Sequence, residues 1–354
     1  MPGYSGCGTN KIGESMYNYD LLKGLCVDEE SKVIFDARKN YLNDRTLVGF
    51  YNIIRKNKKK YVIRDLESYM ELYPAKGWVI YGAGDVAEYN RRLIEDVGFP
   101  AVVCNEADGC EKAYKLVNEQ GYAILFSVPY GQDNLFFKNE ICKYKENEVL
   151  VVNDHLVGRC GIQYFDFFRA SENEVFIDGG CLDGTTSAEF VRWCGGSYDA
   201  ILAFEPNPLL VKQCEQTIQS MKISNIHFYD KALWNCNEIC PFCAEEGSKW
   251  DARISIGGQF MVPGITLDSV CDDYKVTFIK LDIEGAEKEC LQGAKKTIEK
   301  NRPKMAVSVY HAPEDLFWIM EYILHICNEY KFALRHYHSD CIETVLYAFI
   351  GDEI

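Results

Sequence analysis

The stretch from Val175 to Glu205 constrains the fold of this chain more than any other. An apolar run, Val175 to Ile177, ends in a glycine turn, and a second apolar run, Ala200 to Phe204, ends in Glu205. A strand, a glycine turn, a helix and an acid-tipped strand are the parts with which Rossmann-like folds hold a nucleoside. The glycines let the backbone approach a ligand, and the carboxylate accepts ribose hydroxyl hydrogens. The stretch predicts an α/β domain that binds an adenosine cofactor.

The spacing of the glycines indicates which cofactor. The turn has the pattern Asp-x-Gly-x-x-x-Gly from Asp178 to Gly184, with Leu182 where a dinucleotide-binding turn has its second glycine. That glycine lets a pyrophosphate lie against the helix N-terminus, so its absence disfavours NAD. An acid at the start of the turn suits a ligand that carries an ammonium group and a sulfonium. S-adenosylmethionine has both groups.

Further motifs follow in a fixed order. They are VFIDGGCLDGTTSAEF, LAFEPNP, DKALWN, TLDSV, FIKLDIEGAE and ETVLYAF. In this order the chain from Gln163 to its C-terminus resembles the FkbM family of S-adenosylmethionine-dependent methyltransferases. The resemblance implies a Rossmann-like class I methyltransferase domain that methylates a hydroxyl of a sugar, glycan precursor or natural product.

The resemblance also implies a set of cofactor-binding residues. Glu205 would hold the ribose hydroxyls, and Thr185 has an equally good interpretation as a helix N-cap. The full set is Asp178, Gly180, Asp183, Gly184, Thr185, Glu205, Asn207, Lys231 and Ala232.

The catalytic candidates follow the later strands, since ligands of parallel sheets bind at the carboxyl ends of the strands. Methyl transfer to oxygen needs an aligned hydroxyl and a general base. His311 is the predicted base because it follows the strand from Met305 to Tyr310 and titrates near neutral pH. A structural histidine is the alternative, and Asp282 is the competing base or an orienting group. The predicted acceptor-binding residues are Glu284, Arg335, His336 and His338.

Two groups of residues could hold a metal. Asp282, Glu284 and His311 offer oxygen and nitrogen ligands to a divalent ion, but no ligand spacing dictates it, so no metal is assigned. The spacing Cys236-x3-Cys240-x2-Cys243 resembles the iron–sulfur loop of radical S-adenosylmethionine enzymes. Because it follows a Rossmann-type core and no repeated βα barrel pattern is visible, we interpret it as coincidental. A metal clip completed by Cys271 is left open.

The chain, with 354 residues and 47% hydrophobic content, is long enough for more than one core. Residues 1–74 are predicted as an N-terminal helical segment, with helices at Asp20–Cys26, Ser31–Tyr41 and Leu66–Tyr73. Residues 75–155 are predicted as a small Rossmann-like α/β domain, with strands beginning at Trp78, Ala101, Ala123 and Glu148. Residues 156–354 are the methyltransferase domain, with a helix from Pro313 to Glu329 and a closing antiparallel strand, Glu343 to Ile350.

The small domain contains a second glycine turn, Gly82 to Ala87. Asn105 and Glu106 fall about where a ribose-binding acid is expected. A lone glycine fingerprint is a weak motif, so packing or acceptor docking is the favoured role. The alternatives are a nucleotide or nucleotide-sugar binding protein that uses this turn, and a non-catalytic S-adenosylmethionine-binding scaffold.

A formal charge of −15 argues against nucleic acid as a partner, because nucleic-acid binding depends on basic patches. The basic run Arg55–Lys60 fits a solvated helix end. No segment approaches the length of a membrane span, and the first residues are polar, so the expected location is the cytoplasm. The 16 cysteines fit cytosolic thiols. The expected partner is a small-molecule or carbohydrate acceptor, and the oligomeric state is left open.

Overall fold

A seven-stranded sheet forms the centre of the larger part of the molecule. The computed structural model describes residues 17–56, 61–63, 75–82, 84–96, 99–104, 110–128, 149–153, 157–159, 161–220, 222–244, 252–338 and 341–351. The strand order is β16-β17-β15-β14-β7-β8-β9. The strands are β7 (Glu174–Gly179), β8 (Tyr198–Phe204), β9 (Ile226–Tyr229), β14 (Phe278–Leu281), β15 (Lys304–Ser308), β16 (Lys331–His336) and β17 (Thr344–Phe349).

The neighbouring strands β15, β14, β7, β8 and β9 are parallel, and β17 pairs antiparallel with both β15 and β16. The predicted α/β fold with a mainly parallel sheet is therefore confirmed. The last strand is antiparallel, as predicted, but it lies inside the sheet, and β16 forms the edge.

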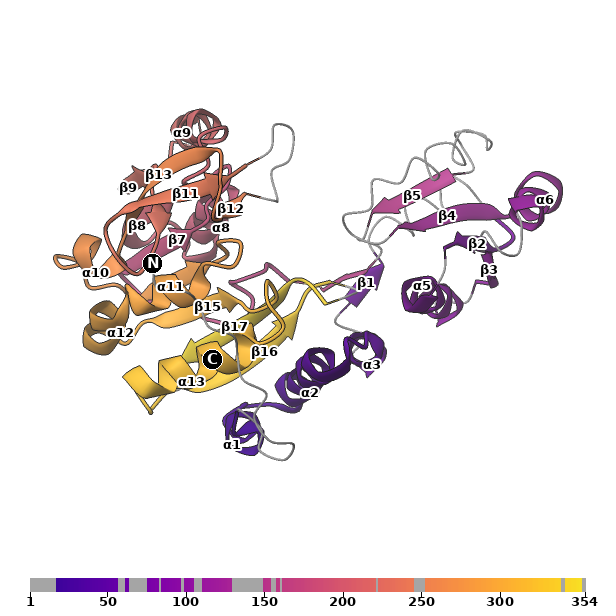
Figure 1. Cartoon of the computed structure of the whole chain (residues 1–354), viewed down its shortest axis with the longest axis horizontal. Helices are drawn as coiled ribbons and strands as arrows, with labels where there is room; N and C mark the ends of the chain where they lie inside the picture. The colour runs from indigo at the N-terminus through magenta and orange to yellow at the C-terminus, as the bar shows by residue number, and fades with distance from the viewer. Residues whose placement is uncertain are drawn as a thin grey trace.

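Helices cover both faces of this sheet (Figure 1). Alternate side chains of β7 point to opposite faces, so Ile177 packs with Leu291 and Ile298 while Phe176 stacks on Phe190 at 4.3 Å between ring centroids. This two-sided burial explains why the strands have nearly continuous apolar sequences. The helices are α8 (Thr185–Trp193), α9 (Val211–Ser220), α10 (Leu267–Val270), α11 (Glu287–Gln292), α12 (Lys295–Asn301) and α13 (Asp315–Ile326).

A second, four-stranded sheet lies between β9 and β14 in the sequence. It consists of β10 (Ala232–Leu233), β11 (Ile239–Cys243), β12 (Arg253–Ile254) and β13 (Phe260–Ile265), in the order β10-β13-β11-β12. The sequence analysis did not predict it, because its strands are short and two of its pairings are between distant segments.

Three N-terminal helices pack onto the edge of the large sheet. They are α1 (Tyr19–Gly24), α2 (Glu29–Asp44) and α3 (Val48–Lys56). The Ser31 hydroxyl at the start of α2 accepts a hydrogen bond from the Leu334 backbone N–H of β16 at 2.9 Å. The segment before α2 forms a parallel bridge between Cys26 and Phe332. The helices predicted near Asp20–Cys26 and Ser31–Tyr41 are present, and they share the core of the C-terminal part. The helix predicted at Leu66–Tyr73 lies outside the described residues.

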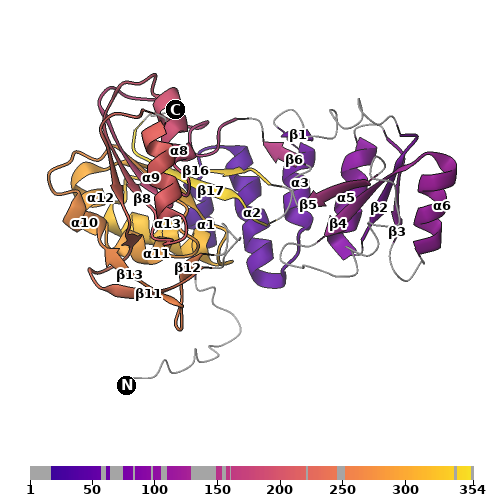
Figure 2. The ribbon, with the colours of Figure 1, turned by 90° about the horizontal axis from the view of Figure 1, so that it is seen from above.

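A smaller α/β unit stands apart from the large sheet in both views (Figures 1 and 2). Its sheet, in the order β3-β2-β4-β5, is parallel throughout. The antiparallel pair β1 (Tyr61–Ile63) and β6 (Val157–Arg159) lies where the chain enters and leaves the unit. Its elements are β2 (Trp78–Tyr81), α5 (Gly84–Asp96), β3 (Ala101–Cys104), α6 (Cys110–Gln120), β4 (Ala123–Val128) and β5 (Val149–Asn153).

The strands predicted in this region are thus present. Ala83 of the second glycine turn and the region of Asn105 and Glu106 lie outside the described residues, so the predicted packing or docking role and the alternative of a nucleotide site are both untested. In the described part of the chain, no helix has the length and apolar character to cross a membrane.

Candidate functional site

A cavity of about 500 Å³ opens at the carboxyl ends of the parallel strands. Gly180 follows β7, Glu205 follows β8, Lys231 follows β9 and Asp282 follows β14, and all four line it. This is where parallel α/β sheets bind ligands. The lining comes from five regions: Gly161, Gln163 and Tyr164; Gly180 to Asp183 with Thr185 and Thr186; Phe204 to Pro206 and Lys231 to Leu233; Phe242, Ala252 and Ile254; and Lys280, Asp282 to Glu284, Ala286, Tyr337, His338 and Glu343.

Backbone strain is concentrated around this cavity. Four lining residues other than glycine have positive φ: Tyr164 at 73°, Leu182 at 52°, Glu284 at 55° and Glu343 at 55°. Residues other than glycine rarely adopt this backbone conformation. It persists where the surrounding structure enforces it, often at functional sites. Only Leu182 lies in the glycine turn that the sequence analysis emphasised.

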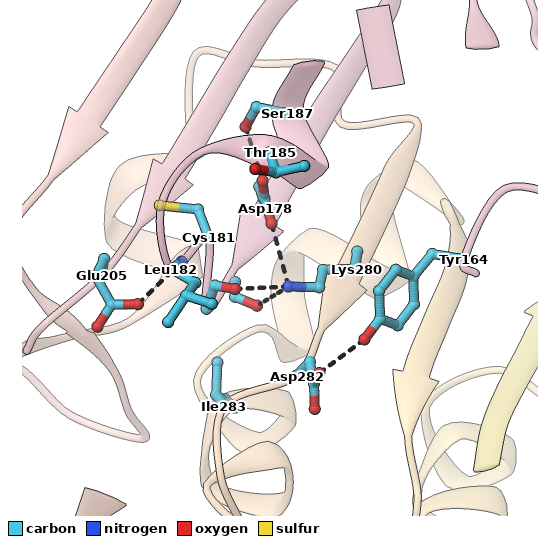
Figure 3. Close-up of polar contacts among 12 residues, drawn as sticks. Tyr164, Asp178, Cys181, Leu182, Thr185, Ser187, Glu205, Lys280, Asp282 and Ile283 are labelled. Atoms are coloured by element: carbon cyan, nitrogen blue, oxygen red, sulfur yellow. Dashed lines mark hydrogen bonds and ion pairs between the residues drawn. The ribbon is translucent and has the colours of Figure 1, made fainter. Parts of the chain in front are cut away.

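Glu205 lines the part of the cavity that we call the cofactor end, because the sequence analysis predicts cofactor binding there. Figure 3 shows its contact with the glycine turn. Its carboxylate accepts one hydrogen bond from the Leu182 backbone N–H at 3.0 Å and another from the Asn207 N–H at 2.9 Å. Burial raises the pKa of Glu205 to about 7 despite these two donors. The carboxylate still borders the cavity, so it can accept ligand hydroxyl hydrogens in the way the sequence analysis predicts.

Asp178 is buried beneath the turn and does not line the cavity. The Lys280 ammonium donates to its carboxylate at 3.2 Å and to the carbonyl oxygens of Gly179 at 2.9 Å and Gly180 at 2.7 Å. The Ser187 hydroxyl donates to the second carboxylate oxygen at 2.7 Å. Burial alone would lower the pKa of Lys280, but Asp178 and Asp282 raise it above its usual value. Asp178 therefore holds the turn in place, together with a lysine that the sequence analysis did not single out.

The remaining cofactor candidates divide into two groups. Asp183, Thr185, Lys231 and Ala232 line the cavity with Gly180 and Glu205. Gly184 is the N-cap of α8 at φ 83°, so Thr185 begins the helix and donates its hydroxyl to Asp183 at 2.7 Å. Gly184 and the buried Asn207 lie behind the lining.

Asp282 also lines the cavity, in a part that we call the acceptor end because the sequence analysis predicts acceptor binding there. The Tyr164 hydroxyl donates to its carboxylate at 2.7 Å (Figure 3). The Tyr310 hydroxyl donates to the same carboxylate at 3.1 Å. Burial favours the neutral form, but His311, Lys280 and the Tyr164 hydrogen bond lower the pKa of Asp282 below its usual value. The side chain is an ionised hydrogen-bond acceptor that faces the cavity.

Glu284, His338 and Glu343 complete the acceptor end. Gln163 donates to the Glu343 carboxylate at 2.5 Å. Burial and the nearby Asp282 raise the pKa of Glu343 to about 7. The sequence analysis missed Gln163, Tyr164 and Glu343. Gln163 and Tyr164 lie in the segment before β7, to which the sequence analysis assigned no role in the site.

His311 lies behind the cavity lining. Its Nε2 is 3.6 Å from Asp282 and 3.3 Å from Glu284, and its Nδ1 is 3.2 Å from Glu287. Burial would lower the pKa of His311, but Glu287, Glu284 and Asp282 raise it well above its usual value. The structure thus brings His311 and Asp282 together, with Asp282 nearer to a ligand.

Arg335 and His336 are not brought to the cavity. Arg335 forms an ion pair with Asp28 at 2.7 Å, because the segment before α2 covers this part of β16. The buried His336 ring lies 4.9 Å from the Phe50 ring of α3, and its Nδ1 is 2.9 Å from the Thr344 hydroxyl. Both residues were predicted to follow a strand, but they are the last two residues of β16 and face the N-terminal helices.

The cysteine cluster does not have the arrangement of a chelate. Cys240 is buried and Cys243 is half-buried in β11, whereas Cys236 is exposed before it. Residues three apart in a strand point to opposite faces, which separates the Cys240 and Cys243 thiols. Within the described ranges, the one group with the spacing of metal ligands is Asp282, Glu287 and His311.

Comparison with known proteins gives one family. Residues 178–337 match the family described as Methyltransferase FkbM domain. No relative was found among the curated proteins.

Solved structures that are similar to this chain include three that we name here. The first is methyltransferase FkbM from Methylobacillus flagellatus, with 18% identity and a TM-score of 0.49 over 87% of this chain and 99% of that one. The second is a putative methyltransferase from Streptococcus mutans in complex with SAH, with 9% identity and a TM-score of 0.33 over 51% and 89%. The third, fibrillarin from Aeropyrum pernix with bound S-adenosyl-L-methionine, has 11% identity and a TM-score of 0.32 over 51% and 67%.

Proposed function

This chain belongs to the FkbM family of methyltransferases through its residues 178–337, and from that premise we propose an S-adenosylmethionine-dependent O-methyltransferase. The proposed acceptor is a hydroxyl of a sugar, a glycan precursor or a natural product. The observation that carries the proposal is the position of Glu205. Its carboxylate accepts a hydrogen bond at 3.0 Å from the backbone N–H of Leu182 in the glycine turn, and it lines the cavity.

The residues at the cofactor end fit an adenosine ligand with a positively charged tail. Glu205 offers carboxylate oxygens to the ribose, as a strand-end acid does in Rossmann-like folds. The turn from Gly180 to Asp183 lets the backbone border the ligand, and Asp183 adds a carboxylate to the same wall. Asp178 contributes indirectly, because Lys280 neutralises its charge.

Asp282 is the proposed general base. S-adenosylmethionine, when bound, supplies the methyl group of its sulfonium, so that a carbon–sulfur bond breaks while a carbon–oxygen bond forms. The acceptor hydroxyl must lose its proton in this step, and the Asp282 carboxylate is an acceptor that reaches the cavity. His311 lies behind Asp282 and acts as a positioning residue, since its Nε2 lies 3.6 Å from the Asp282 carboxylate.

The acceptor end favours a neutral, hydroxyl-rich molecule. Asp282, Glu284 and Glu343 provide carboxylate oxygens, which accept hydrogen bonds from several hydroxyl groups at once. The same carboxylates would repel phosphate or carboxylate groups of an acceptor. Glu284 and His338 remain the proposed substrate-binding residues, and Glu343 joins them.

The test is release of S-adenosylhomocysteine when the full chain is mixed with S-adenosylmethionine and a panel of neutral sugars and polyols. Asp282→Asn should lower turnover by about 100-fold or more, since general bases contribute about 10²–10⁴. It should leave the Kd for S-adenosylmethionine within about twofold, since a base acts on the rate of transfer. Asp199→Asn, an exposed aspartate at the amino end of β8, is the matched control and should keep full turnover. Full turnover by Asp282→Asn would exclude Asp282 as the base.

A further inference from the structure

Behind the acceptor end, four side chains form a cluster that the methyl transfer leaves partly unexplained. One ligand atom each from Asp282, Glu287 and His311 lies within 4.8 Å of the other two. Glu284 adds a fourth group, 3.3 Å from the His311 Nε2. Asp282 and Glu284 lie in the turn after β14, Glu287 is the first residue of α11, and His311 lies in the segment after β15.

The charges in this cluster do not balance. Three carboxylates face one imidazole, so even a protonated His311 leaves an excess of two negative charges. Glu287 is 1% exposed and Asp282 21% exposed in their side chains, so water screens them poorly. Lys280 lowers the pKa of Asp282 through its charge, but its ammonium donates to Asp178 and two carbonyl oxygens. Across the described residues, no lysine or arginine forms an ion pair with Asp282, Glu284 or Glu287. Uncompensated charge of this kind calls for a cation.

The dimensions and supports of the cluster fit a divalent ion. Oxygen ligands lie about 2.0–2.6 Å from Mg²⁺ or Ca²⁺, so ligands on opposite sides of one ion are about 4–5 Å apart. The separation of up to 4.8 Å falls in that range. Two tyrosine hydroxyls hold the Asp282 carboxylate, and the Ile283 N–H donates to Glu287 at 2.8 Å. Such supports orient metal ligands.

His311 provides a separate observation. Both of its ring nitrogens are screened from solvent, and neither makes a hydrogen bond of normal geometry within the described structure. They point at carboxylates 3.2–3.6 Å away. The carboxylates around this imidazole are ligands that suit Mg²⁺ and Mn²⁺, and the imidazole adds a nitrogen ligand of the kind that first-row transition metals accept.

We propose that Asp282, Glu287 and His311 bind one divalent cation of the Mg²⁺ or Mn²⁺ class, with Glu284 beside it. Asp282 borders the cavity, so the ion would lie at the acceptor end. There it would help an acceptor hydroxyl to lose its proton, a consequence that rests on the proposed function. Binding of the ion itself does not depend on methyl transfer.

The experiment is a titration of the purified full chain, first freed of metal with EDTA, with Mn²⁺ followed by electron paramagnetic resonance. The expected result is one bound Mn²⁺ per chain. Glu287→Gln and His311→Gln should each weaken binding by about tenfold or more, in the range seen when groups around a metal are removed. Glu314→Gln changes a neighbouring carboxylate that is 41% exposed and pairs with Lys288, so it should bind as the native chain does.

Two results would overturn the ion site: no Mn²⁺ bound at millimolar concentration, or unchanged binding by both Glu287→Gln and His311→Gln. Circular dichroism identifies a variant that has unfolded, and Mn²⁺ binding by the other of the two variants then tests the ion site. S-adenosylmethionine binding is measured on the same samples. Intact cofactor binding without Mn²⁺ binding overturns the ion site alone, whereas the reverse overturns the proposed function alone.

Discussion

The two ends of the cavity solve the problem of buried charge in different ways. At the cofactor end, each buried carboxylate has donors of its own: Lys280 and Ser187 for Asp178, and two backbone N–H groups for Glu205. At the acceptor end, three carboxylates surround His311 without a lysine or arginine in the described ion pairs. The comparison teaches that the protein's own donors balance the buried carboxylates at the cofactor end. At the acceptor end an excess of negative charge remains, which is typical of a site that binds a cation.

The largest effect is expected from breaking the ion pair between Lys280 and Asp178. Lys280→Met leaves Asp178 buried without a counter-charge, which costs about 3–5 kcal/mol of unfolding free energy. Urea denaturation measures this loss. Adding Asp178→Asn to the same chain removes the unpaired charge and should recover much of the stability. A Lys280→Met chain as stable as the native one would show that the cofactor end does not depend on this pair.

The next effect concerns the close approach of the glycine turn to β14. Gly180 has φ 75°, and a Cβ built there would overlap the backbone carbonyl oxygen of Asp282. Gly196 has φ 78° with nothing within 4 Å of its Cβ, so Gly196→Ala is the matched control. The control should lose about 1–2 kcal/mol from its backbone conformation. Gly180→Ala should lose a further 1–3 kcal/mol or so from overpacking and should bind S-adenosylmethionine more weakly. Equal losses in the two variants would remove the argument for close approach.

A pH series sharpens the role of Glu205. Its pKa of about 7 means that it is protonated in the empty protein at pH 6 and ionised at pH 8. The ionised form is the one that accepts both ribose hydroxyl hydrogens, so affinity for S-adenosylmethionine should fall by about tenfold from pH 8 to pH 6. Glu205→Gln cannot titrate and should lose that slope. A slope that persists in Glu205→Gln would assign the titration to another group.

The smallest effect is expected at the acceptor end. Tyr164→Phe removes one of the two hydroxyl donors to Asp282, which should cost about 0.5–1.5 kcal/mol of unfolding free energy. It should leave the Kd for S-adenosylmethionine within about twofold, because the substitution removes only the hydroxyl, which contacts Asp282 and Gln163, and keeps the ring that Lys280 contacts. Urea denaturation and calorimetry check the two parts. Loss of cofactor binding would mean that the two ends are not separable.

The same comparison explains what the sequence could predict. Most of the cofactor end is encoded in one continuous stretch from Asp178 to Asn207, so a strand, a turn and an acid-tipped strand are visible as a pattern. The acceptor end is assembled from segments that are far apart in the chain, near Tyr164, Asp282, His311 and Glu343. The rule that ligands lie at strand ends found Asp282 and His311. It gave no reason to choose Tyr164 or Glu343.

The same rule also selected Arg335 and His336, which face the N-terminal helices. A strand-end position does not reveal which helix covers it, because α2 and α3 lie about three hundred positions earlier in the chain. The hydrogen bond between Ser31 and Leu334 was not visible as a pattern in either segment. The burial of Asp178 was missed for a related reason, since its partner Lys280 lies in a different motif.

The central claim is that the cavity binds S-adenosylmethionine through Glu205, and calorimetric titration of the full chain tests it directly. We predict one bound molecule per chain. Glu205→Gln should weaken binding by about tenfold or more, since hydrogen bonds to a charged group contribute about 1.5–3 kcal/mol. Glu215→Gln, on an exposed position of α9, should not change it. A folded chain that does not bind at millimolar S-adenosylmethionine, or a Glu205→Gln chain that binds as tightly as the native one, would contradict the account.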